Sequence, residues 1–235
     1  GRAARVLQSK VGRSASTIHK LIYSDCRVTF EVEQDVCEYW FQLKECPSRG
    51  VVIIDEASMV ISHYVDHELF HFGTDNLMND LLTFARLSFG GKIIFVGDPA
   101  QLPPVGEEMS EALNAEFFRA KGLDVCEAEL TEVVRQGGMS AILKNAMSVR
   151  RILNSVQRNS FSMTLNPGEV EQLAEGTLVE RYVAERQASG RNNCVLIAYT
   201  NEKVRGYNVD IRQRLFGDTI FSLNVGEVLV VTQNN

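Results

Sequence analysis

Two adjacent acidic residues, Asp55 and Glu56, follow directly after the apolar run 51–54 (VVII). In an enzyme that hydrolyses a nucleoside triphosphate, an aspartate at such a position holds the Mg²⁺ ion that bridges the β- and γ-phosphates. A neighbouring glutamate can orient and deprotonate the attacking water. An Asp-Glu pair after a strand is also common at the solvated start of a helix, so the pair alone leaves both interpretations open.

A second polar loop follows the next apolar run, 92–96 (KIIFV). Residues 97–106 (GDPAQLPPVG) place Asp98 and Gln101 on a loop that its prolines stiffen. The amide of Gln101, held beside the acidic pair, can hydrogen-bond a γ-phosphate or the attacking water. A simple tight turn would need no particular residue at either position, so the two loops together favour a nucleotide site.

Both loops reach one site only if a parallel sheet positions them. The segments 51–55 and 92–98 are apolar runs rich in Val and Ile, which is typical of strands buried on both faces of a parallel sheet. The spacing of apolar residues over 75–88 predicts a helix between them, capped by Thr74 or Asp75. Strand, helix and strand form a βαβ unit, and such sheets bind ligands at the carboxyl ends of their strands. The predicted fold class is therefore α/β.

Five further elements follow from the same patterns. Residues 27–32 and 39–44 are predicted to form the two strands of a hairpin inserted before the first buried strand. A later strand and helix are predicted over 194–198 and 200–216, and a last strand over 227–232. This second strand–helix unit indicates the beginning of another α/β domain.

The motifs, in this order, resemble those of DNA helicases of superfamily 1B, the RecD/Dda type. DEAS at 55–58 and GDPAQLPPVG at 97–106 are similar to helicase motifs II and III. Motifs II and III together are highly specific, and the resemblance covers almost the whole chain. The supporting blocks lie at 1–4, 16–19, 130–136, 195–201 and 225–231. In that order they are similar to motifs Ia, Ib and IV, to the opening of the second RecA-like domain, and to the strand that precedes the small inserted domain of this family.

The resemblance implies a RecA-like P-loop NTPase fold, with a parallel sheet flanked by helices and an inserted β-hairpin at about 27–44. Residues 1–160 would form the first RecA-like domain without its P-loop strand, and 161–235 the start of the second. The polar stretch around 158–169, which contains Gly and Pro, is the expected boundary. Both ends of the chain look cut rather than natural.

The resemblance also assigns roles around ATP and Mg²⁺. Asp55 would hold the Mg²⁺ ion, Asp98 would lie against the nucleotide, and Glu56 would be the catalytic base. Gln101 would couple the phosphate to DNA. Arg135 would act as the arginine finger, because a planar, permanently charged guanidinium can meet two phosphate oxygens.

Five residues match positions that line the single-strand groove of this family: Arg2, Thr17, His19, Thr200 and Asn201. Hydroxyl and amide groups that touch phosphates fix the register of the DNA without reading its sequence. For Thr17 and Thr200, the N-cap of a helix is an equally good explanation. The predicted partner is single-stranded DNA or a DNA fork, with nuclease or replication and repair proteins as further partners.

The inserted hairpin falls where this family keeps its strand-separating pin. Phe30, Trp40 and Phe41 are then candidates to stack on the base at the fork, a contact that tolerates any sequence. The alternative is a small hydrophobic cluster that covers the edge of the sheet. Alternation along a strand would bury some of the three and expose others.

The sequence departs from the family at several points. No G-x-x-x-x-G-K-[ST] motif occurs in the 235 residues, motifs V and VI are missing, and Val134 replaces the aromatic residue that often precedes the motif IV arginine. We therefore expect no ATPase activity from this chain alone, although the parent protein would be a 5′ to 3′ helicase. Two alternatives are a helicase-like module that binds DNA or a partner without hydrolysis, and the helicase subunit of a RecD-type exonuclease complex.

The bulk properties narrow the class further. A net charge of −6 argues against a protein that binds nucleic acid over its whole surface. The five cysteines form no C-x-x-C pair, so we expect reduced thiols in a cytoplasmic protein. No apolar run is long enough to span a bilayer, so we expect no membrane partner.

Three histidines, His63, His67 and His71, recur every four residues. On a helix they would share one face, a spacing that zinc sites use. No Cys or Glu stands in an obvious completing position. A polar helix face is therefore the preferred interpretation of this pattern.

Overall fold

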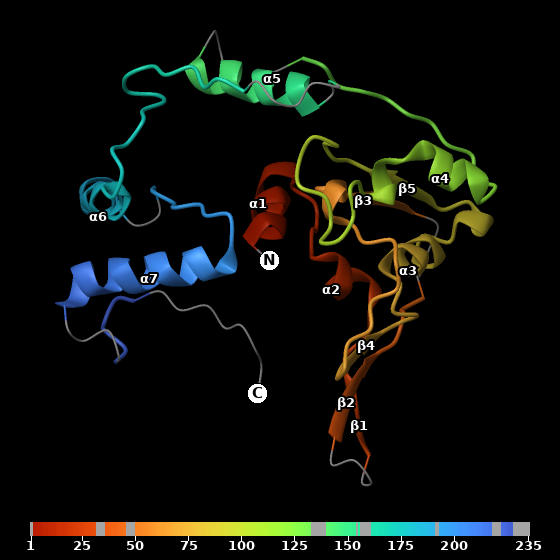
Figure 1. The fold of residues 1–235 in the computed structure, drawn as a ribbon. Helices are drawn as coiled ribbons and strands as arrows, with labels where there is room; N and C mark the ends of the chain where they lie inside the picture. The colour runs from red at the N-terminus through yellow and green to blue at the C-terminus, as the bar shows by residue number, and fades with distance from the viewer. Residues whose placement is uncertain are drawn as a thin grey trace. The chain divides into compact units, whose positions relative to one another are not determined.

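The computed structural model describes residues 2–31, 36–45, 50–132, 140–153, 155, 161–190, 193–217 and 222–227. They belong to two compact units, Gly1–Val133 and Val134–Asn235. Figure 1 labels the elements of both units. Each unit is described by itself.

The centre of the first unit is a pair of parallel strands, β3 (Val51–Ile54) and β5 (Lys92–Phe95). Val51 lies opposite Lys92 and Ile54 opposite Phe95, so both strands end at the same edge. This confirms the two predicted strands and their parallel pairing. The segment between them contains the helix α3 (Leu77–Phe84) and a short 3-10 turn, η2 (Leu87–Phe89).

The predicted helix over 75–88 is confirmed in its middle, but its ends and its cap differ. The side chain of Asn76 accepts the backbone N–H of Asn79 over 3.0 Å, so Asn76 is the N-cap. Asp75 has a positive φ of 55° and belongs to the preceding turn. The predicted caps, Thr74 and Asp75, were wrong because both serve the turn that leads into the helix.

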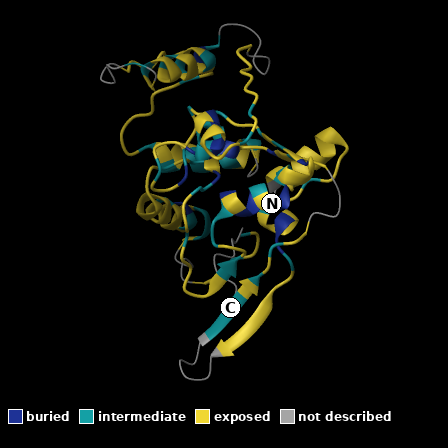
Figure 2. Ribbon diagram, turned by 90° about the vertical axis from the view of Figure 1, so that its right-hand side faces the viewer, coloured by how far each residue is buried: buried dark blue, intermediate teal, exposed yellow. Residues whose placement is uncertain are grey.

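The core of the first unit lies between the paired strands and two helices, α3 and α4 (Ala115–Ala120). Its buried large side chains include Ile22, Tyr23, Ile54, Met78, Leu81, Phe84 and Phe118. Figure 2 shows buried residues concentrated in the body of this unit.

Only one face of the β3–β5 pair packs on this core. Val51, Ile53 and Ile94 are 55%, 64% and 47% exposed. The prediction that both faces of these strands are buried was wrong for the described residues, because α3 and α4 pack with the side chains of the other face, such as Ile54.

A three-stranded sheet extends from the core, and we call it the hairpin sheet. It consists of β1 (Arg27–Glu31), β2 (Val36–Phe41) and β4 (Phe70–Phe72), with β2 in the centre. β1 and β2 are antiparallel, which confirms the predicted hairpin, although β2 begins earlier than expected. β4 pairs with β2 in parallel and was not predicted.

Two helices precede the hairpin sheet. They are α1 (Arg2–Val11) and the short α2 (Ile18–Ile22). Tyr23, directly after α2, forms a β-bridge with Leu43, two residues beyond the end of β2. The hairpin sheet therefore continues directly from the segment that carries α2.

The described helices of the second unit are α5 (Ala141–Leu153), α6 (Leu178–Ser189) and α7 (Asn201–Phe216), and irregular segments connect them. The predicted helix over 200–216 is confirmed. The predicted strand over 194–198 was wrong: Val195 and Ile197 are 77% and 86% exposed, and no strand among the described residues of this unit offers a partner. The predicted strand over 227–232 lies outside the described residues, except for Glu227.

The segment 161–170 folds back on the helix before it. The side chain of Asn145 donates to the carbonyl of Thr164 over 2.9 Å and accepts its N–H over 2.7 Å. The carboxylate of Glu169 accepts the N–H of Ala141 over 2.8 Å, at the start of α5, and this hydrogen bond lowers the pKa of Glu169.

The domain boundary at 160/161 stays a prediction.

No helix of the described ranges combines the length and apolar character needed to cross a bilayer. The described cysteines, Cys26, Cys37, Cys126 and Cys194, are free thiols.

Candidate functional site

The acidic pair stands in a strained turn at the carboxyl end of β3. Asp55 and Glu56 are both exposed, and Oδ1 of Asp55 accepts the backbone N–H of Glu56 over 3.1 Å. Glu56 has φ 54° and ψ 43°, the left-handed conformation, and precedes the 3-10 turn η1 (Ala57–Met59). A non-glycine residue in this conformation is uncommon and costs about 1 kcal/mol or more. Strained backbone conformations of this kind concentrate at functional sites, so the conformation of Glu56 is consistent with a functional site at this turn.

The loop after β5 meets this turn directly. The N–H of Val96 donates to the carbonyl of Ile54 over 2.8 Å, and the N–H of Ala57 donates back to the carbonyl of Val96 over 2.9 Å. A Cβ on Gly97 would lie 3.0 Å from the backbone nitrogen of Ser58. Glycine at this position therefore allows the two loops to touch.

The predicted nucleotide residues of the second loop stand in a tight turn. Oδ1 of Asp98 accepts the N–H of Ala100 over 3.0 Å, and the N–H of Gln101 donates to the carbonyl of Asp98 over 3.0 Å. Gln101 is exposed, and its amide is accessible on the same loop as Asp98. The structure thus brings together the loops that carry Asp55, Glu56, Asp98 and Gln101.

These carboxylates fit a magnesium ion that arrives with a nucleotide. No group of three or more His, Cys, Asp or Glu side chains suited to a metal occurs in the described part of the chain. Mg²⁺ takes one or two carboxylates and completes its shell with phosphate oxygens and water, so a sparse acidic site suits it. Asp55 is the residue that would hold the ion.

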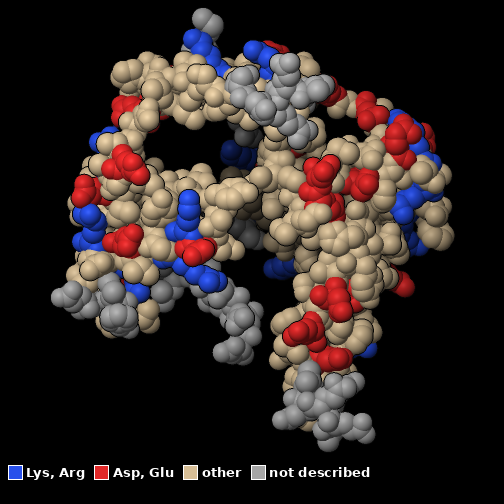
Figure 3. Space-filling view, viewed as in Figure 1, with Lys and Arg blue, Asp and Glu red and all other residues tan. Residues whose placement is uncertain are grey.

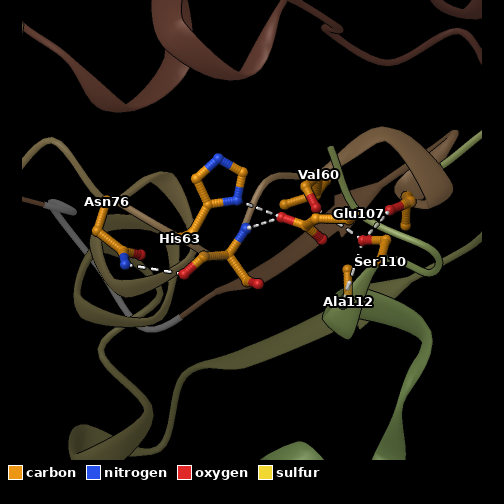
Figure 4. A network of polar contacts seen from close by, with 8 residues as sticks. Val60, His63, Asn76, Glu107, Ser110 and Ala112 are labelled. Carbon is orange, nitrogen blue, oxygen red and sulfur yellow. Dashed lines mark hydrogen bonds and ion pairs between the residues drawn. The ribbon is translucent and has the colours of Figure 1, made fainter. Parts of the chain in front are cut away.

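A polar network holds the segment after η1 in place (Figure 4). The carboxylate of Glu107, in the loop after GDPAQLPPVG, accepts the backbone N–H of Ser62 over 3.4 Å and lies 2.6 Å from Nδ1 of His63. The side chain of Asn76 donates to the carbonyl of Ser62 over 2.9 Å. This segment is therefore fixed both to the second loop and to the start of α3.

A buried serine completes the network. The hydroxyl of Ser110, 2% exposed, lies 2.7 Å from the carbonyl of Val60 and 3.1 Å from that of Ala57. The sequence analysis missed Glu107 and Ser110. Glu107 has no local pattern that distinguishes it from an ordinary loop residue. Ser110 could have been recognised only as the N-cap of η3 (Glu111–Leu113).

The predicted helix face of three histidines does not exist, and that interpretation was wrong. Residues 60–69 form an irregular segment, and His71 belongs to β4. His63 pairs with Glu107, whereas the His71 ring stacks on Trp40 at 4.2 Å. The pairing of β4 with β2 makes this part of the chain extended, so the spacing of four residues between the histidines does not produce a helix.

The DNA candidates of the first unit lie on and beside α2. Thr17 occupies the N-cap position, but its side chain makes no capping hydrogen bond. The ring of His19 packs edge-on against Phe72 at 5.1 Å and lies 5.6 Å from Tyr23. Desolvation by these rings lowers the pKa of His19, and the nearby His67 lowers it further.

The remaining DNA and phosphate candidates differ in how far they are described. Arg2 begins α1, but its side chain lies outside the described residues, as does the whole of Arg135. In the second unit, the hydroxyl of Thr200 caps α7 by accepting the N–H of Lys203 over 3.2 Å. Asn201 is the first residue of α7 and is exposed.

The aromatic candidates divide between the two faces of the hairpin sheet. Phe30 pairs with Cys37 and Arg27 with Trp40, so Phe30 and Trp40 point to opposite faces. Phe30 is 55% exposed and Trp40 41%. Phe41 instead stacks on Phe72 at 4.6 Å and packs against the core. The cluster interpretation therefore describes Phe41, whereas Phe30 and Trp40 remain accessible.

The accessible surface around Trp40 carries charges of both signs, because Arg27 lies opposite Trp40 in the strand pairing. Its indole Nε1 donates to the carboxylate of Glu38 over 3.0 Å. Figure 3 shows Asp and Glu side chains gathered over the hairpin sheet on the face in view.

The family comparison agrees with this arrangement. A family model described as "AAA domain" matches residues 1–151, more than half of the chain, and the chain belongs to this family. It is a family of P-loop nucleoside triphosphatases, found in RecD/Dda-like helicases. No curated protein matches the chain. The family indicates an enzyme of the NTP-hydrolysing class that uses a nucleotide, usually with Mg²⁺.

Proposed function

We propose that this chain is part of the motor of an ATP-driven DNA helicase of superfamily 1B, which moves 5′ to 3′ on single-stranded DNA. The observation that carries the proposal is the contact between the two loops at the ends of β3 and β5. The bond between Ala57 and Val96 and the close approach of Gly97 hold the turn that carries the acidic pair against the loop that carries Asp98 and Gln101. The AAA family and the resemblance to motifs II and III support the same site.

In this function each residue of the site has a separate task. Asp55 would hold Mg²⁺, which neutralises charge on the phosphates when bound. Glu56 would accept a proton from the attacking water, and its strained backbone fixes the start of its side chain. Gln101 would hydrogen-bond the γ-phosphate or the water, and Arg135 would meet the phosphate oxygens.

DNA would be held by Arg2 and by groups that hydrogen-bond to phosphates, and it would be opened by the hairpin sheet. Thr17 and His19 can donate hydrogen bonds to phosphates, as can Thr200 and Asn201 in the second unit. Phe30 or Trp40 would stack on a base at the fork. Because these two lie on opposite faces, only one of them meets a given base.

The chain by itself should not hydrolyse ATP. No G-x-x-x-x-G-K-[ST] motif occurs in its 235 residues, so nothing in it supplies the lysine and backbone N–H groups that hold the β-phosphate. We therefore expect activity only in a natural full-length protein that supplies this loop.

The test is ATP hydrolysis stimulated by single-stranded DNA. We expect the full-length protein to hydrolyse ATP, the 235-residue chain to be silent, and Glu56→Gln to lower kcat of the full-length protein by about 10²-fold or more. Glu108→Gln, which changes an exposed carboxylate two residues beyond the second loop, is the matched control and should leave the rate unchanged. A full-length protein that binds DNA without hydrolysing ATP would instead identify a non-hydrolysing binding module.

A further inference from the structure

A buried carboxylate joins three segments of the chain at the end of the hairpin sheet that lies against the core, which we call the root of the sheet. Asp80 lies in the first turn of α3 and is 1% exposed. Its Oδ2 accepts the hydroxyl of Tyr23 over 2.7 Å and the backbone N–H of Thr74 over 3.1 Å, and its Oδ1 accepts the Thr74 hydroxyl over 2.8 Å. Tyr23 directly follows α2, and Thr74 stands in the turn after β4. One side chain therefore ties α2, α3 and β4 together.

The turn beside Asp80 leaves no room for another side chain. Gly73 has φ 55°, and a Cβ there would lie 2.2 Å from Oδ2 of Asp80 and 2.9 Å from Cε1 of Tyr23. The N–H of Gly73 also donates to the carbonyl of Phe41, the last residue of β2, over 2.8 Å. Because Gly73 has no side chain, the turn after β4 can pack against the Asp80 carboxylate and still hydrogen-bond to β2.

The opposite side of the root is bonded as well. The N–H of Ser24 donates to the carbonyl of Gln42 over 2.8 Å, and the N–H of Lys44 donates to the carbonyl of Ile22 over 2.7 Å. The segment after α2 therefore pairs with the chain that leaves β2. The hairpin sheet is held at its root from both sides.

Aromatic packing connects the same root to the predicted DNA contact on α2. Phe72 of β4 lies 5.1 Å from His19, 5.4 Å from Tyr23 and 4.6 Å from Phe41, measured between ring centroids. Any rotation of the sheet about its root would separate Phe72 from His19. The orientation of the sheet and the position of His19 are thus linked.

The chemistry of this junction favours a carboxylate. Burying a charged group is costly unless hydrogen bonds satisfy it, and the hydroxyl and N–H donors of Tyr23 and Thr74 do so here. Burial, together with the bond to Asp80, raises the pKa of Tyr23, so its hydroxyl stays a donor. An amide of the same shape would keep one acceptor oxygen for Tyr23 and the Thr74 N–H, but its NH₂ group would force the Thr74 hydroxyl to accept, and the charge that strengthens all of these hydrogen bonds would be lost.

We infer that Asp80 is a positioning residue that fixes the orientation of the hairpin sheet relative to His19. Nothing in the family resemblance assigns a role to this position. The inference rests on the proposed function to the extent that this orientation matters for strand separation. The fixing of the sheet can be measured independently of that function.

The single tryptophan of the chain provides the first measurement, because Trp40 lies on the central strand of the hairpin sheet. In the unmodified chain, we expect the fluorescence anisotropy of Trp40 to decay mainly with overall tumbling. Asp80→Asn should add a nanosecond component of sheet motion, while far-UV circular dichroism stays the same. Asp66→Asn, an exposed carboxylate before β4, is the matched control and should add none.

A milder variant keeps the test decisive if Asp80→Asn fails to fold. Thr74→Val retains the carboxylate and removes only the hydroxyl donor, so it should loosen Trp40 to a smaller extent. Unchanged anisotropy in the folded variants would overturn the inference.

The second measurement compares two activities of the full-length protein. Asp80→Asn should lower the rate of strand separation about tenfold more than the rate of DNA-stimulated ATP hydrolysis. We expect this difference because the substitution misplaces the hairpin sheet, which would separate the strands, and leaves the nucleotide site in place. An equal loss of both activities would show a merely structural role and overturn the inference. A wild-type protein that hydrolyses ATP but separates no strands would contradict the proposed function, and the Trp40 measurement would still decide whether Asp80 fixes the sheet.

Discussion

The backbone N–H of Ala57 donates to the carbonyl of Val96 over 2.9 Å, so the turn that follows the acidic pair is bonded to the strand end that carries Asp98. This bond crosses between two parallel strands just beyond their last paired residues, Ile54 and Phe95. A shift of either loop therefore moves the other.

The close approach of Gly97 should make even a methyl group costly. A Cβ there would lie 3.0 Å from the nitrogen of Ser58 and 3.1 Å from that of Ala57. We expect Gly97→Ala to destabilise the chain by about 1–2 kcal/mol in urea unfolding, and to lower the ATPase rate of the full-length protein. Gly206→Ala, in the middle of α7 with nothing within 4 Å, should raise stability by about 0.5–1 kcal/mol. Equal effects of the two substitutions would contradict this account.

The left-handed backbone of Glu56 should show a conflict between stability and activity. Asparagine adopts this conformation more easily than glutamate does, so Glu56→Asn should stabilise the chain by about 0.5–1 kcal/mol. The same substitution should abolish ATP hydrolysis by the full-length protein, because it removes the predicted base. Thermal unfolding and the ATPase rate check the two parts separately. A destabilised variant would show that the glutamate side chain, and not strain, dominates the stability of this turn.

The carboxylate of Glu107 should contribute to stability through its bonds to Ser62 and His63. Its side chain is 14% exposed, so solvent screens these contacts only in part. We expect Glu107→Gln to lower the free energy of unfolding by about 1 kcal/mol in urea titrations. Its neighbour Glu108 is exposed, and Glu108→Gln should have no effect. A silent Glu107→Gln would mean that the network in Figure 4 contributes nothing measurable.

The pKa of His19 should be lower than the ordinary value of 6.5. The unfolded chain then binds a proton at His19 more readily than the folded chain, so His19 reduces stability as the pH falls through 6.5. NMR titration of the His19 ring protons measures the pKa directly. His67→Ala should raise this pKa part of the way back, because one of the two causes is removed. A pKa at or above the ordinary value would contradict the packing of His19 on Phe72.

The parallel strands and the hairpin could be predicted because their signals are local. Val51–Ile54 and Lys92–Phe95 are continuous apolar runs, and the acidic and Gly-Asp-Pro loops follow them at once. The same logic failed for 194–198, because an apolar run becomes a strand only when another strand pairs with it.

The rest of the candidate site depends on contacts between distant parts of the sequence. β4 has only three residues, and its pairing with β2 could not be recognised from them alone. Asp80 looks like the polar face of a helix until Tyr23 is known to lie against it. In the same way, Glu107 and His63 are separated by 44 residues and meet only in the folded chain.

The separation between Tyr23 and Asp80 also has a consequence for the order of folding. β1 and β2 are joined by a short connection, so their pairing needs only a small loop closure and should form early. The hydroxyl of Tyr23 finds its acceptor 57 residues further along the chain, after β3 and β4 have passed. We therefore expect the hairpin to form first and to dock last, when α3 presents its carboxylate.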